Sequence, residues 1–310
     1  MKVLLVTPFS SEQLTSLQMD GADIAVKKRE EVTAEELKDT EAVLGNLPMR
    51  LLEEAPALKW VQLDSAGIGE YGRLPENVAL TNASGAYGEA ISEHMLGAVL
   101  AMMKNLYHYY DLQKEHTWIN LGSVNTISSS TVLCVGMGDI GSSFARKMNA
   151  LGAEVYGIRR TVHDVPDYIK GCGTMKDLDE YLSKADVVAL SLPETEETKH
   201  LFNEERLRKM KKGALLVNVG RGSAIDTEAL IKVMKEKYLA GVCLDVTEWE
   251  PLPKNSALWE IENVYITPHI SGRFNAKVTH DKVLQIFKDN LKHYISREPL
   301  EHVVDKKAGY

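Results

Sequence analysis

The sequence TVLCVGMGDIG, residues 131–141, decides the fold of this chain. It begins with five β-branched or apolar residues and continues into the glycine pattern G-x-G-x-x-G. A helical pattern follows to about Leu151, and a second apolar run covers residues 154–158. Strand, tight turn, helix and strand within about 30 residues are typical of the unit that binds a dinucleotide.

Each glycine of the pattern has its own physical task. Gly136 permits the tight turn, Gly138 lets the backbone approach a pyrophosphate, and Gly141 lets the helix lie close to the strands. The N–H groups of Asp139 and Ile140 begin the helix and face the anion. We expect the Asp139 side chain to point away from the phosphates. The competing interpretation is a glycine-rich turn in an ordinary α/β protein, which the flanking strands and helix disfavour.

The residues after the second strand of this unit select the dinucleotide. A unit that binds NAD places a carboxylate there for the ribose 2′-hydroxyl. This chain instead has Arg159, Arg160 and Thr161, with no carboxylate before Asp164. Guanidinium groups bind a 2′-phosphate through bidentate, charge-assisted hydrogen bonds. The sequence therefore predicts NADP(H) as the preferred cofactor and NAD(H) as a weaker one. Two solvated arginines are the competing interpretation.

Length and composition indicate an ordinary globular protein of two domains. The chain has 310 residues, 44% of them hydrophobic and 26% charged, and a net charge of −8. Its length exceeds what one core usually holds, and its negative charge argues against nonspecific binding to nucleic acid or membranes. Three cysteines without a C-x-x-C pair indicate neither a disulfide framework nor a metal site. We expect a cytoplasmic protein, because no apolar stretch suits a signal peptide or a membrane span.

Strands alternate with helices on both sides of the glycine pattern. This alternation predicts parallel, doubly wound sheets with helices on both faces. Before the pattern, the expected strands are residues 2–7, 24–26, 42–44 and 60–63. A long connecting helix is expected from Gly88 to about Leu112. It carries Glu93 and His94, which we expect to be packing or salt-bridge residues. After the pattern, further strands bring the second sheet to six or seven.

Three chemically active side chains follow late strands of the second sheet. Arg221, Glu250 and His269 should therefore lie at the edge of the sheet that binds the pyrophosphate. Together they fit reduction of a 2-keto acid by hydride transfer. His269 can protonate the developing alkoxide, Glu250 can fix the imidazole tautomer, and Arg221 can hold the carboxylate and keto oxygen in one plane. Three structural residues at strand ends are the competing interpretation.

Three motifs surround these side chains: N-V-G-R-G at residues 218–222, L-D-V-x-x-x-E-P-L-P at 244–253 and T-P-H-I-S at 267–271. With the rest of the chain they resemble the D-isomer-specific 2-hydroxyacid dehydrogenases, especially the glyoxylate and hydroxypyruvate reductases. The order Arg, Glu, His matches the catalytic residues of that family. The resemblance implies that Glu250 is the catalytic acid and that Glu248 is not.

The resemblance also assigns binding residues. It implies that Ser65, Ala66, Gly67 and Ile68 form the substrate-carboxylate loop, working through the N–H groups of Ala66 and Gly67. Spacing alone favours an ordinary turn there. The substrate would also contact Arg221 and His269. On the nucleotide side the resemblance adds Leu192, Pro193, Val219 and Asp245, the last at the nicotinamide carboxamide.

The resemblance further implies two Rossmann-like domains with a cleft between them, the substrate domain being flavodoxin-like. We expect residues 1–98 and 287–310 to form the substrate domain and residues 99–286 the dinucleotide-binding domain. The expected protein is a homodimeric NADP(H)-preferring reductase that converts a small 2-keto acid to the D-2-hydroxy acid. Three alternatives stay open: a reductase of bulkier branched or aromatic keto acids, an NAD-dependent enzyme that oxidises phosphoglycerate, and a nucleotide-sensing, corepressor-like binding protein.

Overall fold

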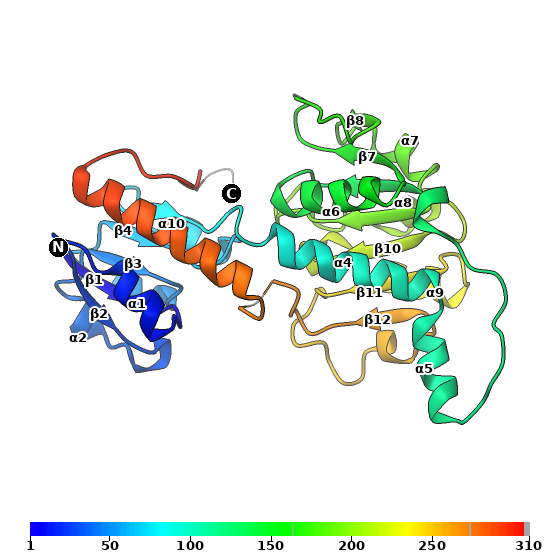
Figure 1. Ribbon diagram of the computed structural model, residues 1–310, viewed down its shortest axis with the longest axis horizontal. Coiled ribbons are helices and arrows are strands. Elements are labelled where there is room, and N and C mark those ends of the chain that lie inside the picture. Colours follow the sequence, from blue (N-terminus) through cyan, green and yellow to red (C-terminus); the bar gives the residue numbers. More distant parts are fainter. Residues whose placement is uncertain (163, 273, 307–310) are drawn as a thin grey trace. The chain divides into compact units, whose positions relative to one another are not determined.

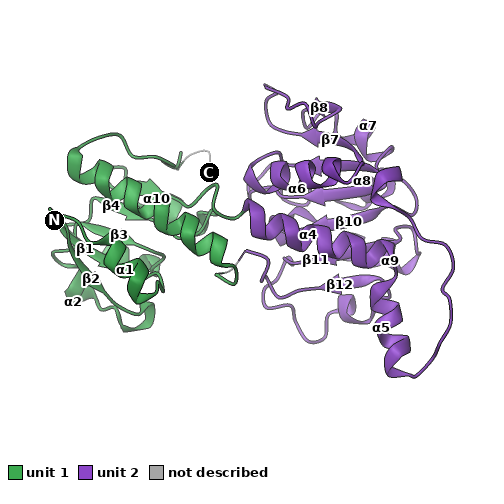
Figure 2. Cartoon of the chain, viewed as in Figure 1, with its two compact units in different colours: residues 1–87, 274–310 green, residues 88–273 purple. Residues whose placement is uncertain are grey.

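The computed structural model describes residues 1–162, 164–272 and 274–306. The chain forms two compact units, Met1–Tyr87 with Phe274–Tyr310 (unit 1) and Gly88–Arg273 (unit 2), coloured separately in Figure 2. The expected boundaries, 98/99 and 286/287, fall inside two helices, α4 and α10. The observed divisions lie before those helices begin, because each helix is continuous and packs as a whole within one unit.

Unit 1 is built around a parallel sheet of five strands in the order β2-β1-β3-β4-β5. This is the flavodoxin-like order that was predicted. The strands are β1 (Lys2–Leu5), β2 (Asp23–Val26), β3 (Ala42–Leu44), β4 (Trp60–Gln62) and β5 (Ala79–Thr81). The helices are α1 (Ser11–Leu17), α2 (Ala34–Leu37), α3 (Met49–Glu53) and α10 (Lys277–Ser296). Short 3-10 turns cover Arg29–Glu31 and Gly69–Arg73.

The C-terminal part of the chain completes unit 1. Val303 forms an antiparallel bridge with Thr81 on β5. Asn290 on α10 is fully buried and donates from Nδ2 to Gln62 Oε1 on β4 (2.7 Å). Its Oδ1 accepts from the backbone N–H of Glu301 (2.7 Å). Buried polar groups are costly unless they are paired, so these contacts specify how the helix and the tail attach to the sheet.

Unit 2 is built around a parallel sheet of seven strands in the order β12-β11-β10-β9-β6-β7-β8. Counted from β6, this is the dinucleotide-binding order 3-2-1-4-5-6 with one added strand, and the order reverses between β6 and β9. The strands are β6 (Thr131–Val135), β7 (Glu154–Ile158), β8 (Gly171–Gly173), β9 (Val187–Leu190), β10 (Leu215–Asn218), β11 (Gly241–Leu244) and β12 (Val264–Ile266). The helices are α4 (Gly88–Met103), α5 (Leu106–Lys114), α6 (Asp139–Ala150), α7 (Leu178–Leu182), α8 (Glu204–Lys209) and α9 (Thr227–Lys235).

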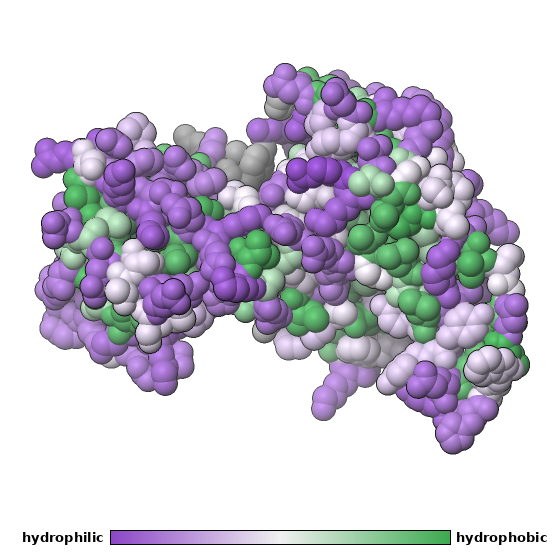
Figure 3. All heavy atoms as spheres, viewed as in Figure 1, coloured by the Kyte–Doolittle hydropathy of each residue, from purple (hydrophilic) through white to green (hydrophobic). Residues whose placement is uncertain are grey.

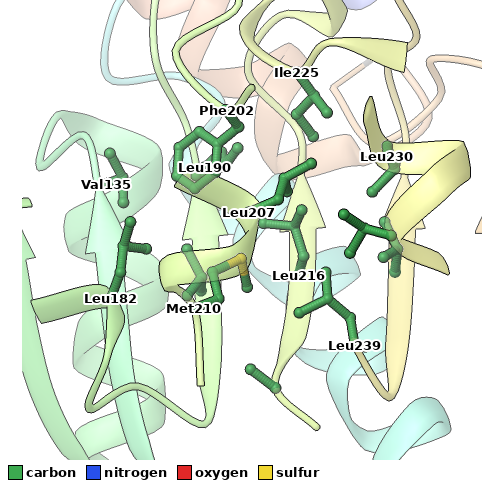
Figure 4. Packing of buried hydrophobic residues seen from close by; sticks show 14 of the residues in the cluster. Val135, Leu182, Leu190, Phe202, Leu207, Met210, Leu216, Ile225, Leu230 and Leu239 are labelled. Atoms are coloured by element: carbon green, nitrogen blue, oxygen red, sulfur yellow. The ribbon is translucent and has the colours of Figure 1, made fainter. Parts of the chain in front are cut away.

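Helices cover both faces of the larger sheet. Helices α4 and α6 pack together over β6, β7, β10 and β11 (Figure 1). On the other face, side chains from α7, α8 and α9 pack against the strands in one apolar cluster that includes Leu182, Leu207 and Leu230 (Figure 4). Strands β9, β10 and β11 are buried along their whole length. This burial explains why they read as continuous apolar runs rather than alternating ones.

The predicted connecting helix is in fact two helices. Helix α4 ends at Met103 and α5 starts at Leu106, with Asn105 between them at φ +53°. Asparagine tolerates this left-handed conformation better than most residues, and a residue in that conformation cannot continue a right-handed helix. Within the described residues, no helix is both long enough and apolar enough to cross a bilayer.

Candidate active site

The glycine turn after β6 has the geometry of a nucleotide site. Gly136 has φ +96°, which glycine adopts freely. A Cβ atom on Gly141 would lie 1.9 Å from the carbonyl oxygen of Gly136, so only glycine allows helix α6 to approach this closely. A Cβ on Gly138 would meet no atom within 4 Å. The backbone is thus open at the position where a pyrophosphate would approach.

Asp139 begins helix α6 and its side chain turns to another helix. Its Oδ2 accepts a hydrogen bond from the backbone N–H of Gly88, the first residue of α4 (2.6 Å). The first intrahelical bond of α6 runs from Ser142 N to Gly138 O (2.9 Å). The N–H groups of Asp139, Ile140 and Gly141 precede that bond and have no i−4 carbonyl partner. A dinucleotide therefore fits this turn, with backbone donors available for its phosphates.

Arg159, Arg160 and Thr161 directly follow strand β7. The backbone N–H of Arg159 donates to Gly173 O at the end of β8 (3.0 Å), while Arg160 and Thr161 are exposed. Burial raises the pKa of the Cys172 thiol on β8, and the positive charge of Arg159 opposes that rise. The backbone of Arg159 is therefore joined to the end of β8, beyond the second strand of the nucleotide unit.

The turns after β9 and β10 lie against each other. A Cβ atom on Gly220 would lie 2.6 Å from the backbone nitrogen of Leu192, so the two turns meet at backbone distance. Leu192 and Val219 are buried and Pro193 is exposed. Ser191, which sequence reasoning missed, donates from Oγ to Gly136 O (2.9 Å) and joins this region to the glycine turn.

Arg221 is held by its own turn. The Asn218 side chain stabilises that turn with two hydrogen bonds. Its Nδ2 donates to Arg221 O (2.9 Å) and its Oδ1 accepts from Gly220 N (3.1 Å). The guanidinium donates from one terminal nitrogen, Nη1, to Gly220 O (2.8 Å). A Cβ on Gly222 would lie 2.0 Å from the Thr247 carbonyl, so the Arg221 turn packs directly on the loop that carries Glu250.

Glu250 and His269 form the pair that the sequence predicted. His269 Nδ1 lies 2.7 Å from Glu250 Oε2, although 19 residues separate them. The second carboxylate oxygen, Oε1, accepts from the backbone N–H of Thr247 (3.2 Å). A carboxylate at Nδ1 fixes the ring orientation and directs Nε2 away from the pair. The geometry suits a histidine that gives a proton from Nε2.

Asp245 supports the segment that carries His269. Its Oδ1 accepts from Thr267 Oγ1 (2.6 Å) and Ile270 N (3.0 Å), and its Oδ2 accepts from Ser271 N (3.1 Å) and Ser271 Oγ (2.5 Å). Burial disfavours the ionised carboxylate, but these hydrogen bonds outweigh burial and lower the pKa of Asp245. The side chain is thus directed into the loop, and its expected contact with the nicotinamide carboxamide stays a prediction.

A second histidine–glutamate pair lies in the same unit. Glu248 Oε1 is 2.7 Å from His200 Nε2, and its Oε2 accepts from Thr227 N at the start of helix α9 (3.3 Å). Burial raises the pKa of Glu248, but the hydrogen bonds from Thr227 and His200 outweigh it, so that the pKa is lowered. Glu248 therefore stabilises α9 and is engaged away from His269.

In unit 1, the loop after β4 is hydrogen-bonded through its carbonyl groups. The carbonyl oxygens of Ser65, Ala66, Gly67 and Ile68 all accept hydrogen bonds from neighbouring groups of the same unit. Within the described part of the chain, no acceptor is paired with the backbone N–H of Ala66 or Gly67. Successive N–H groups of this kind bind anions.

Asp64 and Arg29 lie beside this loop. Asp64 is buried and accepts from Thr7 Oγ1 (3.0 Å), and the Arg29 guanidinium lies 3.7 Å from its Oδ2. Burial raises the pKa of Asp64, and the Thr7 hydrogen bond and the charge of Arg29 oppose that rise. A basic residue beside this loop was not expected from the sequence, because Arg29 belongs to the turn after β2.

Sequence reasoning also missed the residues that hydrogen-bond to the loops carrying Arg221, Glu250 and His269. Thr267 and Ser271 stand inside the quoted T-P-H-I-S motif, and Asn218 begins N-V-G-R-G, so the motifs could have indicated them. Nothing in the sequence distinguishes Ser191 or Thr247. Among the described residues, no group of three or more His, Cys, Asp and Glu side chains is arranged to hold a metal ion.

Comparisons with known proteins agree with this geometry. Residues 96–271 match the profile described as "D-isomer specific 2-hydroxyacid dehydrogenase, NAD binding domain". The chain is 34% identical over 251 residues to a glyoxylate reductase of Thermofilum pendens, covering 76% of this chain and 73% of that protein.

Two solved structures match nearly the whole chain. A D-isomer-specific 2-hydroxyacid dehydrogenase family protein of Aeromonas salmonicida is 30% identical, with a TM-score of 0.89 and coverage of 98% of this chain and 99% of that one. An NADPH-dependent glyoxylate/hydroxypyruvate reductase of Sinorhizobium meliloti, in complex with NADP and sulfate, is 27% identical, with a TM-score of 0.85 and coverage of 100% and 99%. The chain therefore belongs to the D-isomer-specific 2-hydroxyacid dehydrogenase family and is an NAD(P)-dependent oxidoreductase.

Proposed function

We propose that this enzyme is an NADP(H)-preferring reductase of a small 2-keto acid of the glyoxylate or hydroxypyruvate type, and that it forms the D-2-hydroxy acid. The observation that carries the proposal is the 2.7 Å contact between Glu250 and His269 beyond the strands of the nucleotide-binding sheet. The glyoxylate reductase of Thermofilum pendens and the NADPH-dependent reductase of Sinorhizobium meliloti support this substrate class.

Each residue of the site has a distinct role in the proposed reaction. When bound, the reduced nicotinamide supplies the hydride that is added to the keto carbon. His269 as imidazolium donates its Nε2 proton to the carbonyl oxygen, and Glu250 stabilises the positive ring through Nδ1. Arg221 holds the substrate carboxylate and the keto oxygen in one plane. The N–H groups of Ala66 and Gly67, in the loop that includes Ile68, bind the carboxylate.

The cofactor residues follow from the turns at the edge of the sheet. We assign the pyrophosphate to the N–H groups of the turn formed by Gly136, Gly138, Asp139, Ile140 and Gly141. The 2′-phosphate would meet Arg159, Arg160 and Thr161, whose position after β7 supports the preference for NADP(H). Leu192, Pro193 and Val219 would line the nucleotide site, and Asp245 would face the carboxamide. On this division, unit 2 is the dinucleotide-binding domain and unit 1 the substrate domain.

The direct test follows nicotinamide absorbance with glyoxylate or hydroxypyruvate and with NADPH and NADH in parallel. We expect faster oxidation of NADPH, and D-glycerate rather than L-glycerate from hydroxypyruvate. His269→Ala and Arg221→Ala should each lower kcat by about 10²-fold or more, as removal of a general acid or an electrostatic clamp does. If hydroxypyruvate and glyoxylate are inert while branched or aromatic keto acids react, the substrate assignment is wrong. If every keto acid is inert, the catalytic proposal is wrong.

We also propose that the enzyme is a homodimer that works in the cytoplasm, where its three free thiols stay reduced. Unit 2 exposes large apolar side chains on α5 and in the segment after it: Tyr110 is 58% exposed, Trp118 fully exposed and Ile119 53% exposed. Hydrophobic side chains also gather on the side of unit 2 that carries α4 (Figure 3). An exposed apolar patch on a surface is typical of an interface.

Light scattering after gel filtration tests this assembly. We expect the mass of two chains for the wild type, and the mass of one chain for the double variant Trp118→Glu and Ile119→Glu. Trp259→Glu, at a tryptophan that is 50% exposed elsewhere in unit 2, is the control and should leave the dimer intact. A monomeric wild type would contradict the proposal.

A further inference from the structure

Helix α4 places a histidine beside the loop that carries His269. His94 Nε2 lies 3.3 Å from Thr267 Oγ1 and 4.0 Å from Asp245 Oδ1. The His94 side chain is 22% exposed and that of Asp245 only 1%. The buried residues Ile91, Met95 and Val99 lie four residues apart and form the packing stripe of this helix. His94 lies beside that stripe, so the apolar packing of the helix does not require it.

The hydrogen bonds around Thr267 have a defined direction. The Thr267 hydroxyl has one hydrogen, and Asp245 Oδ1 lies 2.6 Å from its oxygen. Asp245 is held in its ionised form by the hydrogen bonds it receives, and an ionised carboxylate only accepts. The Thr267 hydrogen is therefore given to Asp245. Thr267 Oγ1 must then accept from His94, which carries a hydrogen on Nε2. These two hydrogen bonds form a series that runs from His94 through Thr267 to Asp245.

The loop that carries His269 contains a strained residue and depends on hydrogen bonds to Asp245. His269 has φ +51°, a left-handed conformation that costs a non-glycine residue about 1–3 kcal/mol. Its backbone N–H donates to Asp245 O (2.8 Å), and the next two residues donate their N–H groups to the Asp245 carboxylate. Asp245 thus stabilises the backbone of residues 269–271, which includes the strained conformation of His269. Hydrogen bonds in series polarise one another, so a donor at the start of the chain strengthens the rest.

We propose that His94 is a positioning residue for the general acid, acting through Thr267 and Asp245 to hold the loop that carries His269. The inference rests on the proposed function, because it assigns His94 a part in placing His269 at the keto oxygen. Within the described part of the chain, no hydrogen bond or ion pair joins His94 to Arg221 or His269, the reacting groups that we assign. Its effect should appear in the chemical step rather than in nucleotide binding.

The first test uses steady-state and pre-steady-state kinetics. His94→Leu removes the donor but keeps a helix-forming side chain of similar size. We expect kcat to fall about tenfold or more, since small misplacements of a catalytic group cost up to about 10²-fold. The dissociation constant for NADPH should stay within about twofold, because Asp245 and the other residues that we assign to the cofactor keep their side chains. His94→Gln offers an amide N–H in place of Nε2–H and should restore most of the lost rate.

A double-mutant cycle separates this chain from a general loss of packing. Thr267→Val removes the hydroxyl in the middle of the same hydrogen-bond series. The double variant His94→Leu and Thr267→Val should therefore lower kcat little more than either single variant does. Glu93→Gln, at the exposed neighbouring residue of α4, is the control and should keep the wild-type kcat. Additive losses in the double variant, or a glutamine variant as slow as the leucine variant, would overturn the inference.

Two readouts do not depend on turnover. Nitrogen-15 spectra of labelled histidine should show His94 as the Nε2–H tautomer in the wild type and a shifted signal in Thr267→Val. Amide exchange at Ile270 and Ser271 should be faster in His94→Leu than in the wild type. An active wild type with unchanged rates and exchange in His94→Leu would overturn this inference alone. A wild type that reduces no keto acid would overturn the proposed function and this role together.

Discussion

Glu250 contacts His269 through one carboxylate oxygen, Oε2, which lies 2.7 Å from His269 Nδ1. Its other carboxylate oxygen, Oε1, accepts a hydrogen bond from the backbone N–H of Thr247 (3.2 Å). Two residues earlier on the same loop, Glu248 makes an equally short contact with His200. The Glu248–His200 pair is therefore a matched control for the proposed catalytic pair, Glu250 and His269.

Glu250→Gln should change the pH dependence of reduction, and Glu248→Gln should not. The amide removes the negative charge that stabilises the His269 imidazolium, so the rate should begin to fall at lower pH on the basic side. Profiles of kcat/KM against pH measure the shift. Identical profiles for Glu250→Gln and the wild type would count against the pair.

Replacing Arg159 and Arg160 together by alanine should reduce the preference for NADPH. A hydrogen bond to a charged group contributes about 1.5–3 kcal/mol, so the ratio of kcat/KM for NADPH to that for NADH should fall about tenfold or more. Arg146→Ala, at an exposed arginine on α6, is the matched control and should leave the ratio unchanged. An unaltered ratio in the double variant would refute the assignment of the 2′-phosphate.

The glycines at 138 and 141 should respond differently to alanine. Gly141→Ala places a methyl group against the Gly136 carbonyl, and we expect a loss of stability of about 1–3 kcal/mol or more. Gly138→Ala meets no protein atom, so its thermal unfolding should match the wild type. Its affinity for NADPH should nevertheless fall about tenfold, equivalent to 1.4 kcal/mol, because the methyl group occupies the approach of the pyrophosphate. Calorimetric titration and thermal unfolding together distinguish the two effects.

Asp64→Asn should stabilise the protein at neutral pH. Burial raises the folded-state pKa of Asp64 above its unfolded value, so the folded state binds this proton more tightly. The stability of the wild type therefore falls as pH rises from the ordinary aspartate range through the folded pKa. Asparagine does not ionise. The thermal unfolding midpoint of Asp64→Asn should exceed that of the wild type at pH 7, and the difference should shrink toward pH 4. A constant difference would contradict this account.

Much of the fold was predictable because its signals are local. The glycine pattern at residues 131–141 lies between two apolar runs, and continuous apolar strands indicated a parallel sheet. The strands that sequence reasoning missed, β5 and β8, have three residues each, which is too short for a periodic signal. Strand β8 also consists of Gly171, Cys172 and Gly173, and glycine is depleted in strands. The break at Asn105 depends on one backbone angle, which apolar periodicity does not report.

The proposed catalytic residues Arg221, Glu250 and His269 could be selected from the sequence because each is a chemically active side chain that follows a strand. Their supports were harder to predict, because a hydrogen bond from His94 to Thr267 joins residues 173 positions apart. Likewise, Arg29 reaches Asp64 only because β2 and β4 are strands of one sheet whose carboxyl ends lie at a common edge. Sequence identifies which groups can react, whereas the tertiary structure determines which groups hold them.

The attachment of α10 and the tail to unit 1 has a consequence for biosynthesis. Phe287 on α10 is fully buried and packs edge-on against Phe9, with ring centroids 5.7 Å apart, and Asn290 completes the polar contacts of Gln62. A ribosome therefore releases every residue of unit 2 before it supplies α10 and the tail, which complete the unit 1 core. During synthesis the nucleotide-binding unit can reach its native state while residues 1–87 still lack these partners, so the emerging N-terminal segment is the part that most needs protection from aggregation.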